Sequence, residues 1–257
     1  RAPEPELTDA ELLRVSDEAA ELGVSILMLA GGEPLTRPVL FALAERHPQI
    51  AMPVFTNGLL LDDATIARFG THRNLIPVVS LEGHAGETDD RRGSGVHAFV
   101  MGAIAKLRTA GLFYGTSLTV TQANYDLLTS PAYVRELANL GCRLFFFVEY
   151  VPIEPHTEAR CLTDEQKATL PARLEAPRQE LPGLFVALPG EEEELYGGCM
   201  AAGRGFVHIS AEGRLEPCPF APYSDVSLRR MSLREALQSD LLRAIRESDV
   251  HLAETQG

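Results

Sequence analysis

The amino-acid sequence predicts an α/β fold built on a parallel sheet. Between residues 25 and 151, apolar runs of strand length alternate with helical segments, and Gly70, Gly111 and Gly141 each punctuate a helix end. Alternation of this kind favours parallel strands joined by right-handed crossovers. With 257 residues, of which 45% are hydrophobic, the chain can bury a substantial core, as one large domain or as one domain with an appendage.

The first predicted element is a helix that opens at Thr8. Thr8 suits an N-cap, Glu11 completes a capping box three residues later, and Gly23 ends the helix. The apolar runs then predict five strands, over residues 25–30, 51–55, 76–81, 113–120 and 143–151. Helical periodicity predicts the intervening helices, over residues 37–46, 62–69, 96–110 and 131–140.

The C-terminal part of the chain has a different organisation. Residues 153–190 are rich in proline and contain one predicted helix, from about Thr163 to Glu180, so we interpret them as a connector. Beyond Cys199, residues 206–210 and 214–218 predict a β-hairpin whose turn is Glu212-Gly213. A last helix is predicted over residues 232–248, capped by Ser232 with Glu235 three residues later.

Composition excludes several classes of function. The formal net charge of −13 disfavours nucleic-acid partners, which need basic patches for their phosphates. No run of eighteen apolar residues predicts a membrane span, and residues 1–20 do not resemble a signal peptide. Four cysteines in a chain of this size do not suggest a disulfide framework. A reducing, cytoplasmic location is therefore expected.

Small and polar residues follow three successive predicted strands. They are Gly31-Gly32-Glu33-Pro34, Thr56-Asn57-Gly58 and Ser80-Leu81-Glu82-Gly83. Ligands of α/β proteins collect at the carboxyl edge of the sheet, where these segments meet. Glycines let the backbone approach a ligand closely, and Glu33 places there a carboxylate that can hold a cationic group. Taken alone, residues 31–34 are better explained as a turn with a solvated acid, and Asn57 and Ser80 are equally well explained as turn formers at strand ends.

Taken together, these segments resemble the motifs of the radical S-adenosylmethionine (radical SAM) family. Residues 31–34 resemble its GGEP motif, residues 56–58 its TNG motif, and residues 80–83 its S-[LIV]-[DE]-G motif. Asp90-Arg91-Arg92-Gly93 resembles the D-x-x-R-G that follows. The resemblance covers residues 7 to 153 and implies a partial (β/α)6 TIM-like barrel.

The resemblance also implies a binding site for S-adenosylmethionine. Glu33 and the Gly31 and Gly32 backbone would hold the amino group of the cofactor, and Arg92 with Ser80 its carboxylate. Asn57 and Glu82 would bond the ribose or order their neighbours. Backbone near Val151 would flank the adenine. The full set of expected cofactor-binding residues is Gly31, Gly32, Glu33, Pro34, Thr56, Asn57, Ser80, Glu82, Arg92, Thr119 and Val151. The alternative for Arg92 is a surface ion pair with Asp89 or Asp90.

One defining motif of the family, the CxxxCxxC loop that binds a [4Fe-4S] cluster, does not occur in the sequence. The family's barrel has six strands, whereas five are predicted here and the chain opens on a helix. We therefore expect the first strand and the cluster loop to precede Arg1. The expected domains are a partial barrel over residues 1–153, a connector over 154–197 and an extension over 198–257.

The extension resembles the SPASM or twitch type, which holds an auxiliary iron–sulfur cluster. Cys199 and Cys218 flank the predicted hairpin, whose two ends come together, so the resemblance implies that both thiolates ligate such a cluster. The alternative is two unrelated buried thiols. Cys142 is expected to be a buried structural thiol, and the role of Cys161 is left open between a further ligand and a surface thiol.

These observations predict a radical SAM enzyme, an oxidoreductase that cleaves S-adenosylmethionine reductively to a 5′-deoxyadenosyl radical. The radical would abstract hydrogen from a peptide or a small biosynthetic precursor. Implied partners are that substrate and a reducing electron donor, with no nucleic acid and no membrane. Two alternatives stay open: a cluster-less binding scaffold of the same fold, and a TIM-barrel lyase or aldolase that uses the same strand-end acids.

Overall fold

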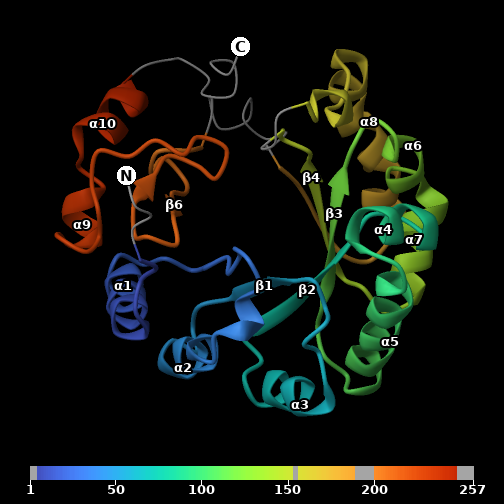
Figure 1. Cartoon of the computed structure of the whole chain (residues 1–257), viewed down its shortest axis with the longest axis horizontal. Coiled ribbons are helices and arrows are strands. Elements are labelled where there is room, and N and C mark those ends of the chain that lie inside the picture. Colours follow the sequence, from blue (N-terminus) through green and yellow to red (C-terminus); the bar gives the residue numbers. More distant parts are fainter. Residues whose placement is uncertain (1–4, 153–155, 189–199, 248–257) are drawn as a thin grey trace. The chain divides into compact units, whose positions relative to one another are not determined.

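The computed structural model describes residues 5–152, 156–188 and 200–247, in two compact units (Figure 1). One unit comprises residues 26–191 and contains the main sheet. The other joins residues 1–25 to residues 192–257. Within the described residues, no helix is both long enough and apolar enough to cross a membrane.

The main sheet has five parallel strands in the order β1-β2-β3-β4-β5, which confirms the predicted α/β class. The strands are β1 (Met52–Thr56), β2 (Leu75–Leu81), β3 (Gly115–Val120), β4 (Leu144–Glu149) and β5 (Leu184–Leu188). Because all four strand pairs are parallel, the carboxyl ends of the five strands lie at the same edge of the sheet.

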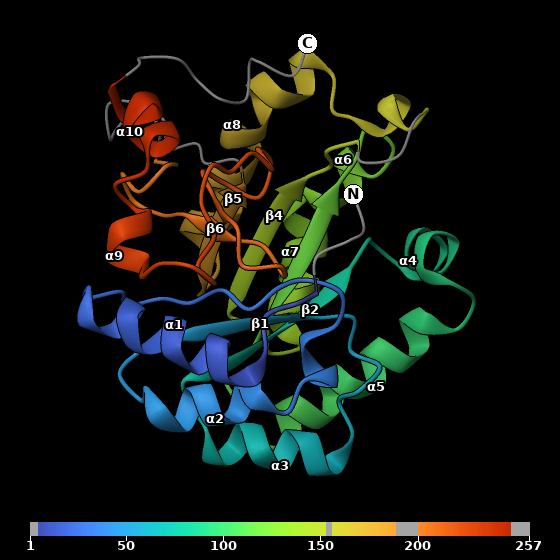
Figure 2. The ribbon, with the colours of Figure 1, turned by 60° about the vertical axis from the view of Figure 1, so that its left-hand side comes forward.

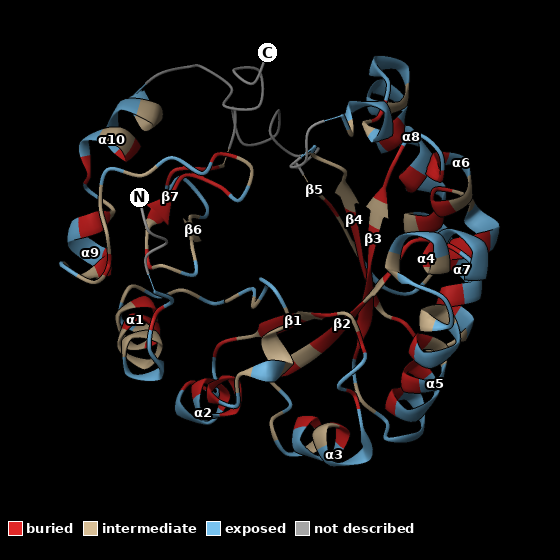
Figure 3. Cartoon of the chain, in the orientation of Figure 1, coloured by how far each residue is buried: buried red, intermediate tan, exposed pale blue. Residues whose placement is uncertain are grey.

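Helices cover one face of this sheet. The longer ones are α2 (Val39–Arg46), α3 (Asp63–Thr71), α5 (Val96–Thr109), α7 (Pro131–Asn139) and α8 (Asp164–Glu180). Figure 2 shows α2, α3 and α5 together on one side of β1 and β2. Strand side chains of this face, such as Val54, Val79 and Phe145, are fully buried (Figure 3). Short segments complete the connections: η1 (Pro34–Thr36), α4 (Ala85–Arg92), α6 (Tyr125–Leu128) and η2 (Glu158–Arg160).

The opposite face of the sheet, which we call the inner face, is only partly buried. Strand alternation and the register place on it Phe55, Ser80, Ser117, Thr119, Phe146, Val148, Val186 and Leu188. Val78, Leu144 and Phe146 form a buried cluster there, against which Phe55, Val148, Val186 and Leu188 pack. The inner face therefore combines an apolar region on β4 and β5 with hydroxyl groups on β2 and β3.

Two strand predictions need correction. Residues 25–30 form no strand; they lie parallel to β1 through two isolated bridges, Ile26–Ala51 and Leu29–Val54. Their hydrogen bonds, such as Leu29 N to Pro53 O at 2.8 Å, are too few for a continuous ladder. The fifth strand is instead β5, within residues expected to be a connector. This short apolar run was not predicted as a strand, because the prolines near it are typical of loops.

The second unit packs the first helix against the C-terminal segment. It contains α1 (Asp9–Glu21), β6 (His208–Ile209), β7 (Leu215–Glu216), α9 (Leu233–Ala236) and α10 (Asp240–Glu247). The backbone N–H of Leu233 donates to the Glu18 carboxylate at 2.5 Å, and Arg14 donates to the Leu228 carbonyl. This grouping places α1 with the C-terminal residues, whereas the domain boundaries given above stay a prediction.

The expected hairpin and both capping boxes of this unit are confirmed. β6 and β7 pair antiparallel, and the capping boxes Thr8–Glu11 and Ser232–Glu235 are both formed. The last helix is not continuous, contrary to the prediction over 232–248. It breaks after Ala236, and the Ser239 hydroxyl accepts the Leu242 N–H at 3.3 Å. Serine at this position starts a second helix because its side chain caps the new N-terminus.

Candidate functional site

Glu33 joins the first two strand-end motifs. It lies at the N-cap of η1, and its carboxylate accepts three hydrogen bonds. Oε1 accepts from the Thr56 hydroxyl at 2.8 Å and from Leu35 N at 3.1 Å, while Oε2 accepts from Asn57 N at 2.8 Å. Asn57 Oδ1 in turn accepts from Leu59 N at 2.9 Å, which fixes the turn after β1. The structure thus brings together the two motifs that lie 23 residues apart in sequence.

The glycines before Glu33 border open space. Gly31 has φ +134, which a side chain would rarely tolerate, and a Cβ at either Gly31 or Gly32 would meet no atom within 4 Å. Both residues are exposed, and their backbone groups make no hydrogen bond within the described part of the chain. Pro34 follows at the start of η1. Backbone carbonyls left free beside a carboxylate suit an ammonium ligand.

Glu82 lies at the end of β2 and is bound by two arginines of α4. It is 1% exposed, and its Oε1 accepts from Arg92 Nε at 2.9 Å and Nη2 at 2.6 Å. Arg91 Nη1 donates to Oε2 at 2.5 Å. The partner of Arg92 is therefore this buried acid and not a surface aspartate. Asp89 instead accepts the backbone N–H groups of His97 and Gly95, and these bonds lower its pKa.

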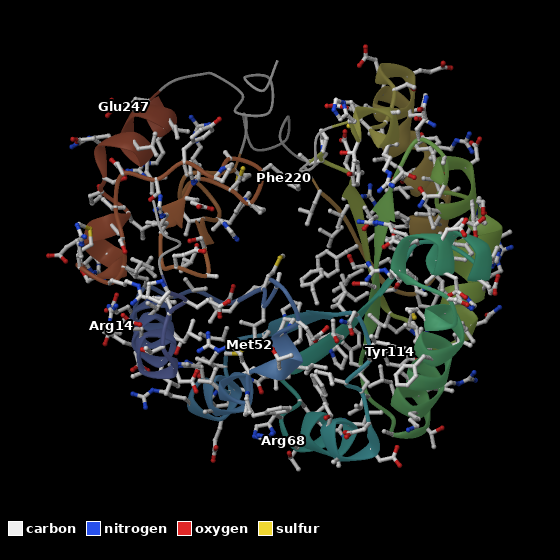
Figure 4. All side chains as sticks on the ribbon, in the orientation of Figure 1. Arg14, Met52, Arg68, Tyr114, Phe220 and Glu247 are labelled. Atoms are coloured by element: carbon white, nitrogen blue, oxygen red, sulfur yellow. The ribbon has the colours of Figure 1, made fainter. Side chains whose placement is uncertain are left out.

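Further expected residues lie along the same edge. Ser80 is next to Ser117 in the register of β2 and β3, and Thr119 is next to Val148 in that of β3 and β4. Both hydroxyl residues are half-buried on the inner face. Val151 is also half-buried and lies just beyond β4. Figure 4 shows the side chains of the sheet, with Met52 of β1 and Tyr114 before β3 labelled.

Sequence reasoning missed one residue that ties this edge together. Asn124 is buried, and its side-chain amide donates to the backbone carbonyls of Glu82 and Thr119, each at 3.0 Å. Its Oδ1 accepts from Thr121 N at 2.7 Å. Asn124 therefore holds the ends of β2 and β3 together. The only signal in the sequence was a polar segment, residues 121–124, directly after an apolar strand.

The cysteines differ in their surroundings. Cys142 is fully buried, as expected, and Cys161 is half-buried. Cys218 is 8% exposed and packs with Ala201, Ala221 and Phe220. Cys199 lies outside the described residues, so a metal centre shared by Cys199 and Cys218 stays a prediction. Among the described residues, no group of three or more His, Cys, Asp or Glu side chains could hold a metal ion.

The thiols give a prediction on reactivity. Burial raises the pKa of the Cys142 thiol to about 12, so almost no thiolate forms near neutral pH. We expect iodoacetamide at pH 8 to alkylate Cys161 in the folded chain and to leave Cys142 unmodified, as peptide mass spectrometry can measure. Modification in urea supplies the control, since both thiols should then react. Equal labelling of both in the folded chain would contradict the burial of Cys142.

The chain matches the Radical SAM superfamily model over residues 1–127. It is 28% identical to an AdoMet-dependent heme synthase of Methanosarcina barkeri, over 96% of this chain and 78% of that protein. It is also 28% identical to a PqqA peptide cyclase of Granulibacter bethesdensis, over 92% of this chain and 65% of that protein.

Two solved structures have the same fold. Streptococcus suis SuiB bound to S-adenosylmethionine superposes with a TM-score of 0.73 at 17% identity, and the match covers 96% of this chain and 62% of that one. For anSMEcpe bound to AdoMet and the Cp18Cys peptide, the TM-score is 0.69 at 17% identity, with 92% and 73% covered. The chain thus spans less than two thirds of the length of SuiB.

Proposed function

Because this chain belongs to the radical SAM superfamily of enzymes, we propose that its sheet edge binds S-adenosylmethionine for radical chemistry on a peptide or a small biosynthetic precursor. The observation that carries the proposal is the Glu33 carboxylate. It is held by Thr56 and Asn57 beside two glycines whose backbone is open to a ligand.

The arrangement leaves room for the cofactor's amino group. An ionised carboxylate offers about four acceptor positions, and three of those on Glu33 are used within the protein. The remaining position and the carbonyls of Gly31 and Gly32 would accept the three N–H bonds of an ammonium group.

The other end of the amino acid requires a cation. Glu82 holds Arg92 through two hydrogen bonds, and the remaining guanidinium N–H groups would bind the cofactor's carboxylate with the Ser80 hydroxyl. Asn57, Thr119 and Val151 would border the nucleoside. In this assignment Glu82 orients Arg92 and does not itself contact the ribose.

When bound, a [4Fe-4S] cluster supplies the electron that breaks the carbon–sulfur bond of the cofactor. Cys142, Cys161, Cys199 and Cys218 do not have the CxxxCxxC spacing of its ligands, so no step through that cluster is assigned to residues of this chain. Cys199 and Cys218 stay proposed ligands of an auxiliary iron–sulfur cluster. The buried setting of Cys218 beside residue 201 is compatible with this role.

The relatives guide the proposed substrate class. One relative is named as a peptide cyclase, and SuiB and anSMEcpe have been solved with peptides bound, whereas another relative is named as a heme synthase. We therefore keep both a peptide and a small precursor as substrates. An external reductant in a reducing compartment completes the proposal.

Replacement of Glu33 tests the cofactor site. Glu33→Gln removes the charge that would hold the ammonium group. In either orientation of the new amide, its N–H₂ group would face a donor, which is the Thr56 hydroxyl in one orientation and Asn57 N–H in the other. We expect S-adenosylmethionine binding to weaken at least tenfold, which is about 1.4 kcal/mol, by isothermal titration calorimetry. The exposed Glu45→Gln change in α2 is the matched control and should leave binding unaltered. Equal binding by both variants would refute the site.

Anaerobic reconstitution with iron and sulfide separates the enzyme from the alternatives when it is done on the full-length protein, so that a CxxxCxxC loop expected before Arg1 can take part. Formation of 5′-deoxyadenosine under reducing conditions supports radical chemistry by the reconstituted chain. A chain that binds S-adenosylmethionine but stays colourless and forms no 5′-deoxyadenosine supports the binding scaffold. A chain that does not bind the cofactor at all leaves the lyase or aldolase as the better interpretation.

A further inference from the structure

Three arginines lie on segments that follow the carboxyl ends of β2 and β4, although the chain carries a net charge of −13. Arg91 and Arg92 extend from α4, and Arg160 extends from η2. Two of the acids nearby are already paired with basic side chains. Glu82 is bound by both α4 arginines, and Glu149 accepts from Lys167 Nζ at 2.9 Å.

Tyr150 brings two of these arginines together. The guanidinium carbon of Arg91 lies 5.8 Å from the centroid of the Tyr150 ring, and that of Arg160 lies 6.0 Å from it. Tyr150 is held directly after β4 by its backbone N–H, which donates to Val120 O at 2.9 Å. Because it follows Val148 by two residues, strand alternation directs its side chain to the inner face.

These three side chains keep unused hydrogen-bond donors. Arg160 is exposed and forms no ion pair with any residue that the structure describes. In the same part of the chain the Tyr150 hydroxyl has no hydrogen-bond partner, and Arg91 uses one nitrogen on Glu82. Arginine stacking on tyrosine would cover the ring, but it leaves the charge of Arg160 without compensation. Two guanidinium groups next to one tyrosine ring, with an unused phenol hydroxyl on that ring, suit an anion, and a planar carboxylate fits the arginine fork.

The surface next to these donors is apolar. Phe146 contacts Phe55 edge to face with centroids 4.8 Å apart, and Val148, Val186 and Leu188 continue this part of the inner face while remaining half-buried. The hydroxyl groups lie elsewhere on the inner face, on β2 and β3. A ligand that lies along β4 and β5 would thus place an apolar body on these side chains and an anionic end at Tyr150.

We infer that Arg91, Tyr150 and Arg160 form a carboxylate-binding subsite for an apolar substrate group that carries a carboxylate. The inference rests on the proposed function only in assigning this ligand as the substrate beside S-adenosylmethionine. The carboxylate belongs either to a peptide, as an acidic side chain or C-terminus, or to a small acid. In both cases it is recognised by the same donors.

The probe for this subsite is 3-phenylpropanoate, an aromatic ring with one carboxylate. Its binding to the unmodified chain can be measured by ligand-observed NMR titration, at constant ionic strength. We expect saturable binding that weakens at least tenfold for 3-phenylpropanamide, which has the same shape without the charge. Arg160→Gln should weaken the binding of 3-phenylpropanoate to a similar extent, whereas S-adenosylmethionine binding stays unchanged.

Arg73→Gln is the matched control, because Arg73 is also exposed and precedes β2 at the opposite end of the strand. It removes the same charge and should not affect the probe. The position of binding can be verified separately, since the chain contains no tryptophan. Tyr150→Trp introduces a single indole there, and its emission should change on titration with 3-phenylpropanoate. That change should disappear in the double variant with Arg160→Gln.

Several results would overturn the subsite. Equal affinity in Arg160→Gln and Arg73→Gln, or equal binding of the amide, would show that no charge recognition occurs. Tenfold tighter binding of phenyl phosphate would assign the donors to phosphate. Competition between S-adenosylmethionine and 3-phenylpropanoate would assign the arginines to the cofactor and leave the proposed function intact. If the unmodified chain does not bind S-adenosylmethionine but binds 3-phenylpropanoate in a way that depends on Arg160, the proposed function is refuted and the subsite is not.

To separate the two substrate sources, a hexapeptide with a phenylalanine before a free C-terminus can be compared with its C-terminal amide. Selective binding of the free acid, tighter than that of 3-phenylpropanoate, favours a peptide, and tighter binding of the small acid favours a small substrate.

Discussion

Replacement of Glu82 by alanine is expected to lower the free energy of unfolding by about 3 kcal/mol. The change removes the only carboxylate shown to bind Arg91 and Arg92 in the described residues, and it leaves both guanidinium groups beside a buried void. The cost lies at the low end of the range for breaking a buried ion pair, because the two arginines reach solvent and water screens their charge. Urea denaturation followed by circular dichroism measures it.

The control for this change is Asp90→Ala, an exposed acid on the same helix, α4. It should alter the stability by less than about 0.5 kcal/mol. A second comparison separates stability from positioning. Arg92→Lys keeps the charge but loses the forked contact with Glu82. It should therefore make the free energy of S-adenosylmethionine binding less favourable by more than it lowers the free energy of unfolding. If Glu82→Ala is as stable as Asp90→Ala, the buried pairing has no structural role.

The second large effect is expected at Gly115, the first residue of β3. A Cβ built there would lie 2.1 Å from the backbone carbonyl oxygen of Leu144 and 2.6 Å from the Leu144 Cβ. Leu144 pairs with Gly115 in the register of β3 and β4, so neither atom can move without breaking the ladder in the middle of the sheet. Gly115→Ala should therefore destabilise the chain by about 3 kcal/mol or more, or prevent folding.

Gly102→Ala provides the comparison. Gly102 lies within α5, and a Cβ there would meet no atom within 4 Å. The same substitution should raise the free energy of unfolding by about 0.5–1 kcal/mol, because alanine loses less entropy in a helix than glycine does. Thermal and urea unfolding of the two variants, measured side by side, give opposite signs. If Gly115→Ala leaves the free energy of unfolding unchanged, β3 and β4 do not approach each other as closely as in the structure.

The sequence was sufficient for elements whose polarity repeats with a clear period. The helices α2, α3, α5 and α7 have such patterns, and strands β1 to β4 are apolar runs of strand length; all of them lie where they were predicted. It was not sufficient for α4, whose residues 85–92 are almost all polar and therefore show no apolar face. The prediction of a strand over residues 25–30 was also wrong, since an apolar run does not reveal whether its backbone completes a ladder.

For the candidate site, motif order predicted which segments meet but not which atoms bond. Glu33 and residues 56–58 were expected at one edge, and the structure joins them directly. Arg92 was weighed against Asp89 and Asp90, its near neighbours in sequence, yet it binds Glu82, ten residues earlier. The choice depends on how α4 folds back over the end of β2, which spacing alone does not specify. The ligand roles of all these residues stay predictions.

The position of α1 has a consequence for how the chain acquires its structure. The bonds that hold this helix, from Arg14 to Leu228 and from Leu233 to Glu18, span 214 and 215 residues of sequence. Such contacts close very large loops, which slows folding. During synthesis α1 leaves the ribosome early, but its bonding partners follow only after the entire five-stranded sheet has been translated. The apolar side of α1 therefore stays exposed to solvent while the sheet can already fold. A chaperone that binds exposed apolar segments would act on α1 during this interval.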